Sequence, residues 1–193
     1  MEWLYQVYLF LDGFLIAPYR MAQPPILGFY LGTGLLALYA VVLGALTSEA
    51  AIWANARNLE DQSHAMVRMH NLSFRALAAK NKKAFKAANH EANDAFGKYF
   101  FAWMANAAAS LWPLAFALGW MQWRFQDVHF AFPGLPIDLG FAFLFLICYI
   151  LASILFSKIK KRLPIFAKSV ALSQMARDHA DEMVTLADLQ ASK

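Results

Sequence analysis

Residues 21–48 read MAQPPILGFYLGTGLLALYAVVLGALTS and contain no Asp, Glu, Lys or Arg. Residues 99–123 and 139–157 are equally free of these charged side chains. Each stretch offers the roughly 20 apolar residues that a helix needs to cross a hydrocarbon core about 30 Å thick. Because lipid offers the backbone no hydrogen bonds, a run of this kind is expected to be helical. The sequence therefore predicts an all-α membrane protein with three transmembrane helices.

The composition agrees with this class, because 60% of the 193 residues are hydrophobic and only 16% are charged. The length leaves no room for a separate catalytic domain. We expect, in chain order, an N-terminal interfacial helix, a first transmembrane helix, a helical hairpin, a second transmembrane helix, an outer loop, a third transmembrane helix and a basic amphipathic tail. The expected boundaries of these segments are 1–20, 21–48, 49–98, 99–123, 124–136, 137–157 and 158–193.

Basic residues predict how the chain is oriented. All but two of the 17 Lys and Arg residues lie in the insert between the first two spans or in the tail, the exceptions being Arg20 and Arg124. By the positive-inside rule, the insert and tail are cytoplasmic, whereas the N-terminus and the outer loop lie outside. We therefore expect a multi-pass protein of the cytoplasmic (inner) membrane. The net charge of +4 suits contact with anionic lipid and calls for no nucleic acid.

The N-terminal stretch is apolar and aromatic but carries Glu2 and Asp12 and lacks a basic start, so it is not expected to be a cleaved signal peptide. A helix over residues 3–17 would be about 22 Å long, which is too short to span. We interpret it as an amphipathic helix lying in the outer interface, with a further tilted span as the alternative.

The insert has the pattern of a helical hairpin with one arm over 48–79 and a returning arm over 84–97. Its tip is basic and is a candidate contact for a soluble or ribosomal partner, with a solvated or lipid-bound tip as the alternative. The residues of this tip are Lys80, Lys82, Lys83 and Lys86. The tail is broken at Pro164 and then amphipathic, so we expect it to dock on the insert or on a partner.

Few polar side chains occur in the predicted spans, and Thr33, Asn106 and Ser110 stand out. Asn106 and Ser110 share a helix face, so they are candidates to line a hydrophilic groove open to the cytoplasm; the alternative is that they bond a neighbouring helix. Small residues spaced by four allow helices to approach closely in lipid. The candidates for such helix packing are Gly28, Gly32, Ala105 and Ala109.

Motifs of enzymes and cofactor sites are absent from the sequence. It contains no glycine-rich phosphate loop, no nucleophile elbow and no HExxH motif, and the predicted spans contain no histidine for haem. His90 and Asp94 would supply only half of a metal site, and Cys148 is expected to be a small buried hydrophobe. We therefore expect a protein that is not an enzyme and that uses no cofactor or metal.

The stretch from Lys86 to Phe101, KAANHEANDAFGKYFF, leads into Ser110-Leu111-Trp112-Pro113 and then Gly119-Trp120. Together with the order of segments, it resembles the junction of hairpin and second span in the YidC/Oxa superfamily of membrane insertases. The similarity is to its small three-span branch, which includes the Get-pathway insertase subunit and the third subunit of the ER membrane protein complex. The resemblance implies an outside N-terminus, a hydrophilic groove open to the cytoplasm, and a hairpin that captures the substrate.

Two other classes fit the same layout. One is a noncatalytic structural or assembly subunit of a larger membrane complex. The other is a motor subunit of the ExbB/TolQ/MotA type, which needs a titratable or hydroxyl-lined path through its spans. The expected partners are the lipid bilayer, other membrane subunits and, for an insertase, a nascent chain or ribosome, with no specific recognition of nucleic acid.

Overall fold

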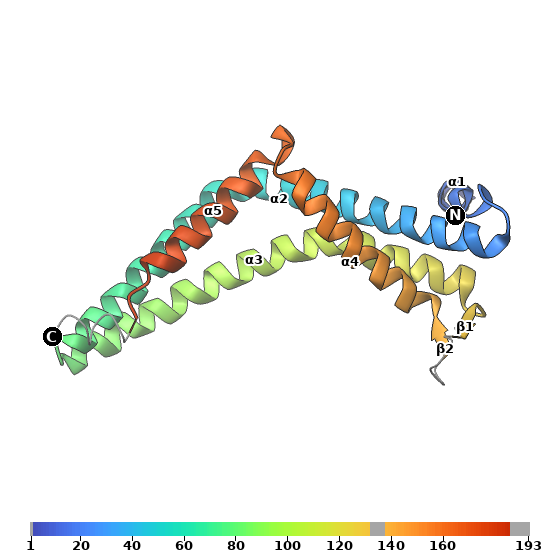
Figure 1. Cartoon of the computed structure of the whole chain (residues 1–193). Coiled ribbons are helices and arrows are strands. Elements are labelled where there is room, and N and C mark those ends of the chain that lie inside the picture. Colours follow the sequence, from blue (N-terminus) through green and yellow to red (C-terminus); the bar gives the residue numbers. More distant parts are fainter. Residues whose placement is uncertain (1, 132–137, 186–193) are drawn as a thin grey trace. The chain divides into compact units, whose positions relative to one another are not determined.

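The computed structural model describes residues 2–131 and 138–185. Its helices, drawn in Figure 1, are α1 (Glu2–Ile16), α2 (Pro25–Ala78), α3 (Lys82–Phe125), α4 (Phe141–Lys160) and α5 (Ala167–Glu182). Short 3-10 turns at Ala17–Arg20 and Pro164–Phe166 follow α1 and precede α5. The described part of the chain is thus almost entirely helical, as its charge-free stretches predict.

Three of these helices, α2, α3 and α4, are long and apolar enough to cross a membrane, which confirms the predicted number. Only 6% of the most apolar window of α4 is buried inside the protein. Ile150, Leu151 and Leu155 on α4 each expose more than half of their surface. A continuous apolar surface of this kind calls for lipid or another apolar partner around it.

The start of α2 is set by consecutive prolines. The carbonyl of Pro24 accepts a hydrogen bond from the backbone N–H of Leu27 at 2.9 Å, and Pro25 is the first helical residue. Proline fits this place because the first N–H groups of a helix have no intrahelical partner. The helix therefore begins at Pro25 rather than at residue 21, where the first span was predicted to begin.

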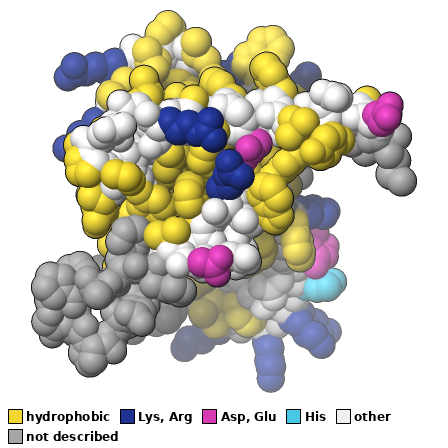
Figure 2. Space-filling model, turned by 90° about the vertical axis from the view of Figure 1, so that its right-hand side faces the viewer, with side chains coloured by type: hydrophobic (Ala, Val, Ile, Leu, Met, Phe, Trp, Pro, Cys, Tyr) yellow, Lys and Arg dark blue, Asp and Glu magenta, His cyan; other side chains and the backbone are white. Residues whose placement is uncertain are grey.

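The chain forms two compact units, the first made of residues 1–46 and 110–162 and the second of 47–109 and 163–193. In the first unit, α1, the 3-10 turn after it and α4 pack with the apolar parts of α2 and α3. The core residues of this unit are Ile16, Tyr19, Phe29, Leu36, Ala37, Ala40, Ala117, Trp120, Met121, Phe141 and Phe145. Hydrophobic side chains also cover much of the face of the molecule seen in Figure 2.

A short antiparallel pair of strands, β1 (His129–Ala131) and β2 (Asp138–Gly140), lies between α3 and α4. The expected outer loop of 124–136 therefore contains the end of α3 and a strand in its described part, while residues 132–136 lie outside the described residues. The predicted third span began at 137, but α4 begins at Phe141. The backbone of Gly140 is extended and pairs with β1, so it cannot belong to the helix.

In the second unit, α5 packs along α2, and α3 contributes to the same core (Figure 1). Ile52 and Leu59 of α2 and Leu172 of α5 are buried, and Ala102 and Trp103 of α3 pack against them. The amphipathic tail therefore docks on the insert within its own chain. A third helix lets the hairpin bury an apolar face that two arms alone would leave partly exposed to water.

The turn between α2 and α3 is tightly hydrogen-bonded. Lys80 adopts the left-handed conformation, with φ of 53°, and the N–H groups of Lys80 and Asn81 donate to the carbonyls of Leu77 and Ala76. This pattern is a Schellman motif, which completes the last turn of α2. The side chain of Asn81 then accepts a hydrogen bond from the N–H of Ala84 and so caps α3.

Lys80→Gly should raise the free energy of unfolding of this hairpin by up to about 1 kcal/mol, because a left-handed backbone costs a side-chain-bearing residue roughly that much. Hydrogen exchange of the backbone amides at the end of α2 measures the change. Lys82→Gly is the matched control, since it places glycine inside the first turn of α3 and should bring no gain. An equal gain from both variants would contradict the role assigned to Lys80.

Candidate functional site

The predicted groove residues of the first unit do not lie together. Thr33 is completely buried, whereas Ser110 is half-buried and its backbone closely faces Gly44 of α2. Thr33 and Gly44 are separated along α2 by about 16 Å, because each helical residue rises 1.5 Å. Within this unit, Thr33 and Ser110 therefore line no common recess.

In the second unit, Asn106 bonds the neighbouring helix. Its side-chain oxygen accepts a hydrogen bond from the Ser48 hydroxyl at 3.2 Å. One residue earlier on α2, the Thr47 hydroxyl donates to the backbone carbonyl of Ala109 at 2.5 Å. Asn106 therefore bonds a neighbouring helix, which was the stated alternative to lining a hydrophilic groove. Thr47 and Ser48 also belong to this site, although they were not among the predicted groove residues. The feature of the sequence that could have indicated them is their position at the end of a charge-free run.

Glu49 extends this polar region to the tail. Glu49 as a whole residue is only 5% exposed, and its Oε1 accepts a hydrogen bond from the backbone N–H of Ser169 in the first turn of α5. The residue before α5 is Phe166, which provides no side-chain cap. A negative charge from α2 thus satisfies one of the unpaired donors at the start of α5 and complements the helix dipole.

We call Thr47, Ser48, Glu49, Asn106 and Ser169 the polar junction. It combines hydroxyl, amide and carboxylate groups at the end of the charge-free run of α2. Glu49 Oε2 is buried and has no hydrogen-bond partner among the described residues. No group of three or more potential metal ligands occurs in the described part of the chain. Within the junction, Glu49 Oε2 is therefore the acceptor available to a further hydrogen-bond donor.

A double-mutant cycle with Ser48→Ala and Asn106→Leu should show a coupling energy of about 0.6 kcal/mol, and at most about 1.7, as found for hydrogen bonds between membrane helices. The measurement is the free energy of unfolding in detergent. Asn55→Ala serves as the control partner for Asn106→Leu, because Asn55 bonds Ala51 in its own helix. Zero coupling between Ser48 and Asn106 would contradict the contact.

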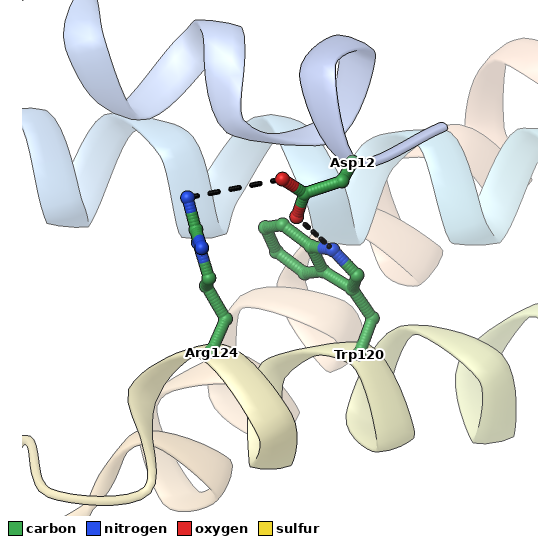
Figure 3. Close-up of polar contacts among 3 residues, drawn as sticks. All are labelled: Asp12, Trp120 and Arg124. Carbon is green, nitrogen blue, oxygen red and sulfur yellow. Dashed lines mark hydrogen bonds and ion pairs between the residues drawn. The ribbon is translucent and has the colours of Figure 1, made fainter. Parts of the chain in front are cut away.

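A second polar cluster, absent from the sequence-based prediction, holds α1 onto α3 in the first unit (Figure 3). The Trp120 indole N–H donates to Asp12 Oδ1 at 3.0 Å, and Arg124 lies 3.8 Å from Asp12 Oδ2. The Asp12 side chain is 16% exposed, so its charge is paired and hydrogen-bonded as a poorly hydrated carboxylate must be. The signal available in the sequence was that Asp12 and Arg124 are isolated opposite charges on the same predicted side.

Beside Asp12, α1 and α3 enclose an apolar pocket with a volume of about 400 Å³. Its lining is formed by Val7, Tyr8, Leu11, Asp12, Phe116, Gly119, Trp120 and Trp123. Burial raises the pKa of the Tyr8 phenol, and the nearby Asp12 carboxylate raises it further. The phenol therefore remains protonated at neutral pH.

Trp120→Phe should lower the free energy of unfolding by about 1.5–3 kcal/mol, because it removes a hydrogen bond to a charged, poorly hydrated acceptor. Thermal unfolding in detergent measures this loss. Trp123→Phe is the matched control, because that ring is 62% exposed and the substitution should cost much less. Similar losses from both variants would mean that the bond to Asp12 contributes little.

The basic tip residues Lys80, Lys82 and Lys83 are exposed. Lys86 is exposed as well and, with Lys83, lines a shallow depression on α3 that also includes His90. His90 lies 3.9 Å from Asp94, one turn further along the same helix. The structure thus leaves the predicted partner-contact lysines accessible.

The small residues predicted to pack helices have different neighbours. Gly28 faces the backbone carbonyl of Tyr19, and Gly32 faces the Tyr19 ring, so both accommodate the 3-10 turn. A side chain at either position would collide with Tyr19. Ala105 is exposed, and Ala109 contributes its carbonyl to Thr47. The close approach of α2 and α3 in the first unit occurs at Gly44, which the sequence reasoning missed.

Comparison with known proteins finds no family model, no curated protein and no solved structure that matches this chain. The class that the structure defines is a helical protein with three helices able to cross a membrane.

Proposed function

We propose that this protein is a membrane-protein biogenesis factor of the YidC/Oxa type, which assists the insertion of client segments into the bilayer. In this proposal the N-terminus and α1 lie at the outer face of the cytoplasmic membrane. The second unit faces the cytoplasm, because nearly all the basic residues lie in the insert and the tail. The resemblance of the 86–101 stretch and the order of segments support the same assignment.

The observation that carries the proposal is the polar junction at the end of the charge-free run of α2. A polar client segment entering lipid loses its hydrogen bonds with water, which costs several kcal/mol for each unsatisfied backbone group. The buried Oε2 of Glu49 has no partner among the described residues and offers a replacement acceptor, and Ser48 and Asn106 would exchange their mutual hydrogen bond for bonds to the client. Such groups lower the barrier for a segment that has left the water and has not yet folded.

A second candidate function is a noncatalytic subunit of a larger membrane complex. It is favoured by α4, whose most apolar window is almost wholly unburied within the chain. Copurification distinguishes the two functions, because a stable complex of several proteins would favour the subunit. A motor of the ExbB/TolQ/MotA type receives less support, because Thr33 is buried away from Ser110.

The test is insertion into liposomes that contain the purified protein. The client has a single apolar span and a short polar tail, and protection of the tail from protease measures its translocation. The protein should increase protection several-fold over empty liposomes, and Asn106→Leu should remove most of this increase. Ala105→Leu is the matched control, since it introduces the same side chain at an exposed neighbouring position.

A client whose translocated tail is short and apolar should be insensitive to Asn106→Leu, because it needs no replacement hydrogen bonds. If the folded protein did not stimulate insertion of either client, the proposed function would be wrong. Equal losses from Ala105→Leu and Asn106→Leu would show that client insertion does not depend on the polar junction.

A further inference from the structure

The end of the tail leaves α5 as an extended segment and is bonded to the insert arm of α2. The Asn71 side chain donates to the backbone carbonyl of Glu182 at 3.0 Å and accepts from the backbone N–H of Val184 at 2.8 Å. His70 Nε2 lies 3.2 Å from the Val184 carbonyl oxygen. Met183, between the two bonded residues, has the extended ψ of 121°.

Every one of these bonds ends on a backbone atom of the tail. The Asn71 amide pairs with the carbonyl of one residue and the N–H of the residue two further on, which is the pattern that one residue of a parallel strand offers to its neighbour. His70 is held in place by stacking on Phe74, with ring centroids 4.6 Å apart. Because these contacts use no tail side chain, they do not distinguish the tail from another extended chain.

The surface next to Asn71 carries two positive charges. Arg68 and Arg75 line a depression with a volume of about 530 Å³ that Asn71 also borders. Both arginines are exposed, and neither forms an ion pair with another described residue. An acidic side chain close to the bonded backbone would therefore be attracted to this surface.

We propose that Asn71 and His70 form a binding site for the backbone of an extended, acidic polypeptide segment, and that tail residues 182–184 occupy this site until such a segment displaces them. The inference rests on the proposed function, because it names where the second unit would hold an unfolded client. The tail acts as an internal competitor, bound through the same atoms that the client would use. Exchange is feasible because few hydrogen bonds at the end of a helix must break.

The test measures the binding of a fluorescent peptide with the sequence of residues 178–185 to the full chain in detergent. Val184→Pro in the protein removes the N–H that bonds Asn71 and should loosen the tail. This variant should bind the peptide several-fold more tightly than the unmodified chain. Adding Asn71→Leu should weaken binding by about two- to tenfold, the range expected for losing hydrogen bonds.

Modified peptides test backbone recognition without changing the protein. A methyl group on the peptide nitrogen of Val184 should abolish most of the binding. The same group at Met183 is the matched control, because the Met183 N–H points to Ala180 within the tail. Replacing both Met183 and Val184 of the peptide by alanine should change its affinity little. Equal effects of the two methyl groups, or insensitivity to Asn71→Leu, would overturn the proposal.

An unrelated extended peptide with two glutamates should bind the Val184→Pro variant more tightly than its lysine counterpart. This preference should weaken with salt and disappear when Arg68 and Arg75 are replaced by glutamine. Peptide binding without stimulated client insertion would retain the site and reject the proposed function. Stimulated insertion without backbone-dependent peptide binding would support the proposed function and reject the binding site at Asn71 and His70.

Discussion

A backbone in hydrocarbon has no water to bond, so each helix that crosses a membrane must satisfy its own carbonyls and amides. Helices α2, α3 and α4 meet that requirement over their charge-free stretches. In the first unit, the Asp12 carboxylate is paired across helices with Trp120 and Arg124. A carboxylate on α1 is tolerable there because its charge is shared with two donors.

The second unit follows a different rule, because it is built from polar-surfaced helices that must bury an apolar seam. Ile52 and Leu59 supply this seam on α2, and Leu172 brings α5 onto it. Polar contacts then fix the register of the tail, with Glu49 at the start of α5 and Ser63 bonded to His179 further along. The functional proposals depend on this arrangement, because it places hydrogen-bonding groups at both ends of the docked tail.

Local patterns in the sequence were sufficient for the helices and for the hairpin turn. The absence of charge identified the apolar helices, and the Lys80-Asn81 interruption marked the turn. Pairings between distant segments were not accessible in this way. Nothing local to Gly32 indicates that its neighbour is Tyr19, and nothing local to Asn106 identifies Ser48 as its partner. Such choices depend on how helices rotate against each other, which one sequence does not encode in any short motif.

The docking of α5 on α2 also constrains the order in which the chain folds. Ser63 and His179 are 116 residues apart, so the apolar seam of the hairpin is complete only after nearly the whole chain has been synthesised. Contacts of such long sequence separation form slowly, since a large loop must close first. During synthesis, Ile52 and Leu59 therefore lack their cover by α5 until Leu172 has been made, 113 residues after Leu59. Exposed apolar surface of this kind makes a nascent chain vulnerable to aggregation.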